Sequence, residues 1–381
     1  IDVIRRMLHK SGMIFDSAQT IVVGHLSNKI RITVMGDGVI DKDKGLSASI
    51  RIVNPRKLTK EQFVGFGTAT AEMLDLLAAC YCHGVSMCIT GATSSGKTTL
   101  MSWILGQVPY NKRIVTLEQG CREFDLTVTD EDGNVLNNVV HLVTRFSDDP
   151  KQNITLVKLL ETTLTINPDC VAVAEMKGAE SMQAINAANT GHAVITTIHA
   201  NSCADTYYRM VTLCKQSYSM DDATLMGLAT KAFPIVAFAK KLEDNSRRLM
   251  EICEYEYLPD GKQRMRTLFR FNITDNQMVD GKPKIIGHYE KVEPPSESLL
   301  KRLRENGMSY TAFLRMKEVS SMSLVAMKQP YLLQVMYDDE PLNPRTDYDN
   351  FGKMVCWHSR YNLGDEHDFE DTNELLKSLA R

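Results

Sequence analysis

Residues 91–100 read GATSSGKTTL, and this stretch decides the fold. Two glycines frame four small or polar residues and are followed by Lys97 and Thr98. A short apolar run, SMCIT (86–90), precedes the loop, and a helix-like segment, KTTLMSWILGQV (97–108), follows it. A glycine loop between a strand and a helix is typical of proteins that wrap phosphate groups. The alternative is a glycine-rich turn without a ligand, and the flanking strand and helix favour the phosphate loop.

The residue types of this loop suit a nucleotide and a magnesium ion. Glycines let backbone N–H groups converge on phosphate oxygens, Lys97 reaches the terminal phosphates, and the Thr98 hydroxyl binds magnesium. The predicted nucleotide-binding residues are Gly91, Ala92, Thr93, Ser94, Ser95, Gly96, Lys97, Thr98 and Thr99.

Composition sets wider limits on the class of protein. The 381 residues are enough for two or three domains, and 43% hydrophobic with 24% charged residues is typical of a globular protein. A net charge of −3 argues against wholesale nucleic-acid binding. The apolar run at 232–239 is too short to span a bilayer.

The nine cysteines form no C-x-x-C pair, which favours a reduced, cytoplasmic compartment. The N-terminus lacks the features of a signal peptide and begins without methionine, so we expect residues upstream.

The pattern of apolar runs predicts an α/β protein in three parts. Residues 1–58 read as a small α+β domain. Residues 59–270 alternate buried strands with helices, which predicts a mainly parallel sheet covered by helices on both faces. Residues 271–381 form a C-terminal extension whose role the sequence leaves open. Asp-Gly pairs at 132–133 and 280–281 predict the tips of two hairpins.

Two predicted strands each end in a glutamate. RIVTLE ends at Glu118 and CVAVAE ends at Glu175. Parallel strands end at the edge that carries the phosphate loop, so both carboxylates are expected beside the terminal phosphate. A single strand-end glutamate is more often a helix cap or a surface acid, but two of them after a phosphate loop favour a site. We predict that Glu175 holds the magnesium, directly or through water, and that Glu118 activates the attacking water.

The stretch TGHAVITTIHANS (190–202) carries two histidines, His192 and His199, at the two ends of a predicted buried strand. A lone histidine there is more often a satisfied core group than a catalytic one. Their odd spacing points the two side chains to opposite faces of a regular strand. We therefore expect different roles, with His199 closer to the nucleotide.

The order of these motifs resembles the secretion ATPase superfamily of type II and type IV secretion, type IV pili and conjugation. The matching motifs are the phosphate loop (Walker A), TLEQGCRE at 116–123 (Asp box), the strand ending at Glu175 (Walker B) and residues 190–202 (His box). Within that superfamily the sequence is most similar to the CpaF-like branch, which serves tight-adherence pili. The resemblance covers roughly residues 12–270.

The resemblance implies an ATP- and Mg²⁺-dependent ATPase with a RecA-like core and ATP held between two domains. It makes Glu118 the catalytic glutamate, Glu123 the second acid of the Asp box, Glu175 the Walker B acid and His199 a sensor of nucleotide state. Arg51 and Arg145 are similar to arginines that reach nucleotide from a neighbouring domain or subunit. Solvated surface charges are the alternative for both arginines.

The resemblance also implies an assembly and a location. We expect a homo-oligomer, a hexamer in this superfamily, that works on inner-membrane platform or secretion-apparatus proteins. The expected location is the cytoplasmic face of the cell membrane, reached through partners, without direct nucleic-acid binding.

Some positions depart from the superfamily pattern. Gln119 stands where aspartate is usual, Thr165 and Asn167 replace arginines, and Ala174 and Lys177 replace the glycine and arginine around the Walker B acid. We still expect hydrolysis, slow or dependent on a partner.

The C-terminal stretch MVCWHSRYNLGDEHDF (354–369) resembles segments of mobile-element proteins, which favours conjugation over pilus assembly. Its Cys356, His358 and His367 match no strong zinc pattern and read as loop residues.

Other functions remain open alongside the motor. A nucleic-acid translocase on a RecA-like core would require basic or aromatic residues along a pore. A hydrolysis-impaired regulatory ring is suggested by Gln119 and the missing arginines. A P-loop kinase is disfavoured because no segment resembles an acceptor-binding lid.

Overall fold

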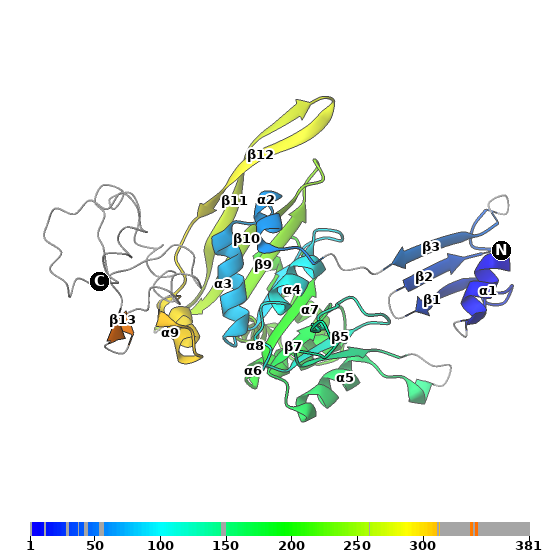
Figure 1. Cartoon of the computed structure of the whole chain (residues 1–381), viewed down its shortest axis with the longest axis horizontal. Coiled ribbons are helices and arrows are strands. Elements are labelled where there is room, and N and C mark those ends of the chain that lie inside the picture. Colours follow the sequence, from blue (N-terminus) through cyan, green and yellow to red (C-terminus); the bar gives the residue numbers. More distant parts are fainter. Residues whose placement is uncertain are drawn as a thin grey trace, which may run out of the picture. The chain divides into compact units, whose positions relative to one another are not determined.

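The structure of the protein is a computed structural model (Figure 1). The described residues are 2–10, 13–27, 30–36, 38–41, 45–52, 57–145, 150–258, 260–310, 312, 336–337 and 340–341. Contacts divide the chain into two units, Ile1–Met308 and Ser309–Arg381. In the second unit, β13 (Met336–Tyr337) pairs antiparallel with β14 (Glu340–Pro341). The stretch 354–369, with Cys356, His358 and His367, lies outside the described residues.

One helix and three strands lie between residues 2 and 52, within the first unit. Its elements are α1 (Asp2–Lys10), β1 (Ile21–Ser27), β2 (Ile30–Met35) and β3 (Ser47–Ile52). The three strands pair in sequence order as an antiparallel meander. Leu8 of the helix and Ile32 and Val34 of the central strand are fully buried in one small core.

A nine-stranded sheet dominates the remainder of the first unit. In spatial order its strands are β12 (Lys282–Lys291), β11 (Gln263–Val279), β10 (Arg247–Tyr257), β9 (Ile235–Lys241), β4 (Met87–Thr90), β8 (Ala193–Ile198), β7 (Cys170–Val173), β5 (Ile114–Glu118) and β6 (Val139–Val143). From β9 to β6 every neighbouring pair is parallel, and from β9 to β12 every pair is antiparallel. The predicted core with a mainly parallel sheet is confirmed.

Two groups of helices pack on the parallel strands. The helices of the first unit after α1 are α2 (Lys60–Gly65), α3 (Ala71–Cys82), α4 (Lys97–Leu105), α5 (Leu156–Thr163), α6 (Glu180–Asn189), α7 (Cys203–Cys214), α8 (Asp222–Ala232) and α9 (Glu297–Glu305). α3 and α4 contact each other and β8, whereas α5 to α8 contact one another and β5, β8 and β9. Val171 and Val173 of β7 belong to the core under α5 to α8, and Ala172 between them is buried outside that core. This alternation is that of a sheet covered on both faces.

Local signals in the sequence correspond to observed caps. Thr59 and Gln62 form a capping box at the start of α2, which the T-x-x-Q pattern of residues 59–62 indicates. Gly84 and Gly191 have positive φ angles of 79° and 104° after α3 and α6, which satisfies the left-handed position that ends a helix.

Among the described residues, none of the helices combines the length and apolar character that a membrane span requires.

The hairpin predicted at 280–281 is present, because Val279 pairs with Lys282 and the two turn residues, Asp280 and Gly281, have φ of 51° and 73°. The boundary predicted after residue 270 is not a boundary in the structure. Residue 270 lies inside β11, and residues 271–308 belong to the first unit. The switch from parallel to antiparallel pairing comes earlier, between β9 and β10, so residue 270 marks no change in the sheet.

The hairpin predicted at Asp132-Gly133 is present only as a narrow turn. Thr129 and Val135 form a single antiparallel bridge across it. The expected returning strand, β6, instead pairs in parallel with β5. Hairpin strands and parallel edge strands share the same alternating residue pattern, so the sequence did not distinguish them.

Candidate nucleotide site

The loop between β4 and α4 has the geometry of an anion-binding turn. Ala92, Thr93 and Ser94 are exposed, whereas Ser95 and Lys97 are buried. Gly96 is the N-cap of α4 with φ of 97° and no side-chain hydrogen bond. The first N–H groups of α4 are therefore left for a ligand at the positive end of the helix dipole.

Glycine is required at position 91 by both conformation and space. Gly91 has φ of 143°, and a Cβ atom there would lie 2.0 Å from the carbonyl oxygen of Ala239. Strand β9, which carries Ala239, thus presses directly against the loop. Any side chain at position 91 would displace the loop or the strand.

Lys97 folds back over its own loop. Its Nζ donates to the carbonyl oxygens of Gly91 (2.8 Å) and Ala92 (2.9 Å) and lies 3.5 Å from Nδ1 of His199. Burial lowers the pKa of the Lys97 ammonium below its ordinary value, and the negative charge of Glu175 opposes that shift.

Glu175 and His199 meet at the carboxyl ends of β7 and β8. His199 Nε2 lies 2.9 Å from Glu175 Oε1, and Lys177 Nζ lies 3.3 Å from the other carboxylate oxygen. Since an ammonium can only donate, His199 Nδ1 accepts from Lys97 and its Nε2–H donates to Glu175. The structure therefore joins Lys97, His199 and Glu175 in one polar chain, and brings together three of the residues that the sequence selected.

Glu118 belongs to a different hydrogen-bond network from that of Lys97, His199 and Glu175. Its side chain is fully buried at the end of β5. Oε1 accepts from the Thr116 hydroxyl (2.7 Å) and lies 3.3 Å from His141 Nδ1. Oε2 accepts from the backbone N–H groups of Glu123 and of Phe124 (2.9 Å). Both carboxylate oxygens of Glu118 thus accept hydrogen bonds from groups of the same chain. Within the described part of the chain, Glu118 forms no hydrogen bond or ion pair with Lys97.

The remaining predicted residues lie elsewhere. Arg145 is exposed, bridges to Ile154 through its backbone and donates to the carbonyl oxygen of Gln152 (3.5 Å). Arg51 is in β3 opposite Arg31, and its side chain is outside what the structure describes. His192 lies at the start of β8 with Nδ1 3.3 Å from the carbonyl oxygen of Ala187, at the opposite end of the strand from His199.

Two contacts at the site were not predicted from the sequence. Arg247, the first residue of β10, donates from Nε to the Ser94 carbonyl oxygen (2.9 Å) and so braces the phosphate loop. His141 of β6 contacts Glu118 and the Thr116 hydroxyl (2.8 Å). Both depend on pairing between strands distant in sequence. The pairing of β4 with β9, and of β5 with β6, was the missing information.

The residues present fit ATP with Mg²⁺. Ser95 Oγ is buried, and among the described residues it has no hydrogen-bond partner. Glycine at 91, an uncapped helix start at Gly96 and a buried lysine complete a cradle suited to phosphate. Thr98 is the first-turn hydroxyl and Glu175 the nearby carboxylate, an oxygen donor set that suits magnesium.

Comparison with known proteins gives the family. Residues 27–268, well over half of the chain, match the family model of the type II/IV secretion system protein. The curated protein MJ0900 of Methanocaldococcus jannaschii is 30% identical over 199 residues, which cover 52% of this chain and 34% of that protein. The type IV secretion system protein VirB11 of Brucella suis is 33% identical over 132 residues, 34% of each chain. The matched part of the chain spans about a third of the length of these two relatives.

Among solved structures, the crystal structure of the VirB11 ATPase from Brucella suis is similar, with a TM-score of 0.41 and 21% identity over 65% of this chain and 77% of that chain. The family assignment rests on the sequence match, which includes the phosphate loop, both strand-end glutamates and the 190–202 stretch. The chain belongs to the type II/IV secretion system protein family.

Proposed function

We propose that this chain is an ATPase, the motor subunit of a machine for secretion, pilus assembly or conjugative transfer. The observation that carries the proposal is the polar chain from Lys97 through His199 to Glu175 at the edge of a parallel sheet. Membership of the secretion family supports the same activity.

Each residue has a role that follows from its position. When bound, MgATP supplies the phosphoanhydride bond whose cleavage releases energy. Lys97 and the N–H groups at the start of α4 bind phosphate charge, and Thr98 and Glu175 offer oxygen ligands for magnesium. His199 contacts both Lys97 and Glu175 and lies four residues before Cys203, the first residue of α7. A change in the charge of Lys97 or Glu175 therefore alters the hydrogen bonds of a residue close to the start of α7.

The assembly is proposed from the family and from the exposed arginine. We infer a ring of identical subunits, a hexamer, in which Arg145 or Arg51 reaches the nucleotide of a neighbour. The ring would act at the cytoplasmic face of a membrane on platform or secretion-apparatus proteins. The CpaF-like branch is the form that the sequence motifs favour.

A second candidate function, a hydrolysis-impaired regulatory ring, is supported by the contacts of Glu118. Both carboxylate oxygens of Glu118 accept hydrogen bonds from groups of its own chain, and the side chain is fully buried. A water-activating role requires that Glu118 be released from Thr116 and from the 123–124 backbone. We infer that hydrolysis waits for that release, which makes the chain slow alone or dependent on a partner.

The central test measures phosphate release and nucleotide binding in the purified chain. Lys97→Ala is expected to abolish hydrolysis, since the buried ammonium is lost. Lys60→Ala is the matched control, because Lys60 pairs with Asp75 at the surface (2.6 Å). Ordinary turnover in Lys97→Ala would refute the site.

Glu175→Gln separates binding from chemistry. We expect it to retain nucleotide and lose hydrolysis by about 10²-fold or more, as removal of a charged group at a phosphoryl-transfer site does. Undiminished turnover would remove Glu175 from the site.

The assembly has its own readouts. We expect the mass in solution to rise to that of a ring with ATP, and a monomer under all conditions would contradict the motor. Stimulation of hydrolysis by DNA would instead support a nucleic-acid translocase.

A further inference from the structure

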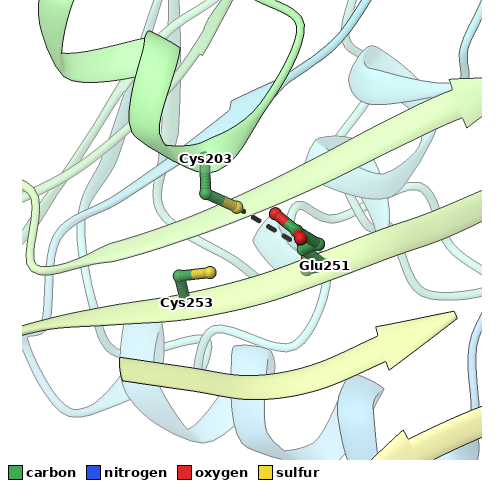
Figure 2. A group of neighbouring side chains, drawn as sticks. All are labelled: Cys203, Glu251 and Cys253. Atoms are coloured by element: carbon green, nitrogen blue, oxygen red, sulfur yellow. Dashed lines mark hydrogen bonds between the residues drawn. The ribbon is translucent and has the colours of Figure 1, made fainter. Parts of the chain in front are cut away.

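Two buried thiols and a carboxylate lie close together outside the residues of the nucleotide site (Figure 2). Cys203 is the first residue of α7, and Glu251 and Cys253 lie two positions apart on β10. One ligand atom from each of the three lies within 4.8 Å of the others. Cys203 and Cys253 are 0% and 2% exposed, whereas the Glu251 side chain is 28% exposed.

The spacing of these atoms is close to that of a tetrahedral metal site. Zinc binds thiolate sulfur at about 2.3 Å, so two such sulfurs lie about 3.8 Å apart. A group whose atoms are all within 4.8 Å reaches that geometry by movements of about 1 Å. Because the three residues stand on a helix start and a paired strand, the backbone holds them in place without a long loop.

The charges around the group also balance. Two thiolates and a carboxylate carry three negative charges against two on a divalent cation. The Arg270 guanidinium lies 3.7 Å from Glu251 Oε1 and offsets the remainder. Cys203 is the first residue of α7, next to the N-cap Ser202, where the positive end of the helix dipole opposes the burial that raises the pKa of its thiol.

The two thiols face oxygen atoms of the protein, and the group is partly open to solvent on the Glu251 side. Cys203 Sγ faces the Val236 carbonyl oxygen at 3.5 Å and the Glu251 carbonyl oxygen at 3.9 Å, and Cys253 Sγ lies 3.9 Å from the Thr267 hydroxyl. A thiol is a weak hydrogen-bond donor, so a cation that replaces these contacts removes little stabilisation. The partly exposed side of the group is that of Glu251, from which water can approach.

We propose that Cys203, Cys253 and Glu251 bind one thiophilic divalent cation of the Zn²⁺ type, with water as the fourth ligand. Two sulfurs select a soft or borderline metal over Mg²⁺ or Ca²⁺. The cation would tie α7, which begins four residues after His199, to β10, whose first residue braces the phosphate loop. It is a site separate from the nucleotide cradle, and its function would be to fix these two elements together.

The test uses Zn²⁺ and Co²⁺ as probes on the full chain, freed of metal by a chelator. Equilibrium dialysis should give one Zn²⁺ per chain, and Co²⁺ should produce thiolate-to-cobalt charge-transfer absorption. Glu251→Gln and Cys253→Ser should each weaken Zn²⁺ binding by more than the roughly 10- to 100-fold that loss of an outer-shell partner causes. Bound Zn²⁺ should also raise the thermal midpoint of the unmutated chain.

Cys82→Ser is the matched control, since this half-buried thiol contacts the Gln107 carbonyl oxygen and lies outside the group. It should bind Zn²⁺ as the unmutated chain does. Glu251→Gln changes a partly exposed side chain, so it tests the site even where Cys253→Ser unfolds.

Two results overturn the proposal. One is the absence of Zn²⁺ and Co²⁺ binding by the unmutated chain. The other is binding that is unchanged in Glu251→Gln and in folded Cys253→Ser, which would place the cation elsewhere.

Discussion

Replacement of Glu118 by alanine, compared with glutamine, tests whether this buried carboxylate organises the loop that follows β5. The carboxylate accepts from the Thr116 hydroxyl and from the backbone N–H groups of Glu123 and Phe124, and it contacts His141. Alanine leaves these buried donors without an acceptor and opens a cavity.

The magnitude follows from the number of donors left unpaired. Each buried donor without a partner costs about 1–3 kcal/mol, and part of that is recovered if water enters the cavity. We expect Glu118→Ala to lower the free energy of unfolding by about 3–5 kcal/mol. Glutamine keeps its amide oxygen on the two backbone N–H groups and turns its NH₂ toward the Thr116 hydroxyl. Its expected cost is only about 1–2 kcal/mol, the difference between charged and neutral hydrogen bonds.

Thermal unfolding and hydrogen exchange measure the contrast. At about 2–4 °C per kcal/mol, Glu118→Ala should melt on the order of 10 °C below the unmutated chain, and Glu118→Gln only a few degrees below it. The amides of Glu123 and Phe124 should exchange faster in the alanine variant. An alanine variant that melts with the unmutated chain, with both amides still protected, would refute the buried role of Glu118.

Three further predictions follow from single contacts. Gly91→Ala should abolish nucleotide binding in a filter or calorimetric assay, because its Cβ would lie 2.0 Å from the Ala239 carbonyl oxygen; Gly133→Ala, with φ of 83° and open space around it, is the control that should bind normally. Arg247→Ala should raise the dissociation constant for nucleotide about 3- to 10-fold, since it removes one charged hydrogen bond to the Ser94 carbonyl oxygen. An unchanged dissociation constant would show that this hydrogen bond does not stabilise the nucleotide-binding form of the loop. Burial raises the pKa of Glu254 above its ordinary value of 4.5, against the opposing effects of Ser296 and Arg266. The folded chain thus binds more protons than the unfolded chain just above pH 4.5, so its free energy of unfolding should fall as pH rises there. Glu254→Gln has no carboxyl to ionise at this position. Denaturant unfolding should therefore show that its free energy of unfolding rises relative to that of the unmutated chain over the same pH range.

Local sequence predicted the features that depend on neighbouring residues. The phosphate loop is decided by glycines whose φ angles only glycine adopts readily, and Gly91 and Gly96 have φ of 143° and 97°. The capping box at Thr59 and the Asp280-Gly281 turn depend on side chains within four residues. Buried strands of continuous apolar residues predicted the parallel core and the ends from which Glu118 and Glu175 project.

Strand pairing was decided by the tertiary structure. β6 lies beside β5 in parallel, although its residues read as the return of a hairpin. β11 continues the sheet through residue 270, where composition suggested an end. These outcomes depend on which apolar faces meet, and alternating patterns are compatible with more than one neighbour.

The sequence by itself determined that a phosphate-binding loop lies at the carboxyl ends of the strands of a parallel sheet. It could do so because the backbone conformation of the loop and the burial of the strands depend on residues that are neighbours in the chain. Only the tertiary structure decided that His199 links Lys97 to Glu175, that Glu118 is enclosed by Thr116 and the 123–124 backbone, and that Cys203 meets Cys253. Side chains on separate strands meet only when strand order and register bring them together, and that order results from packing of the whole core.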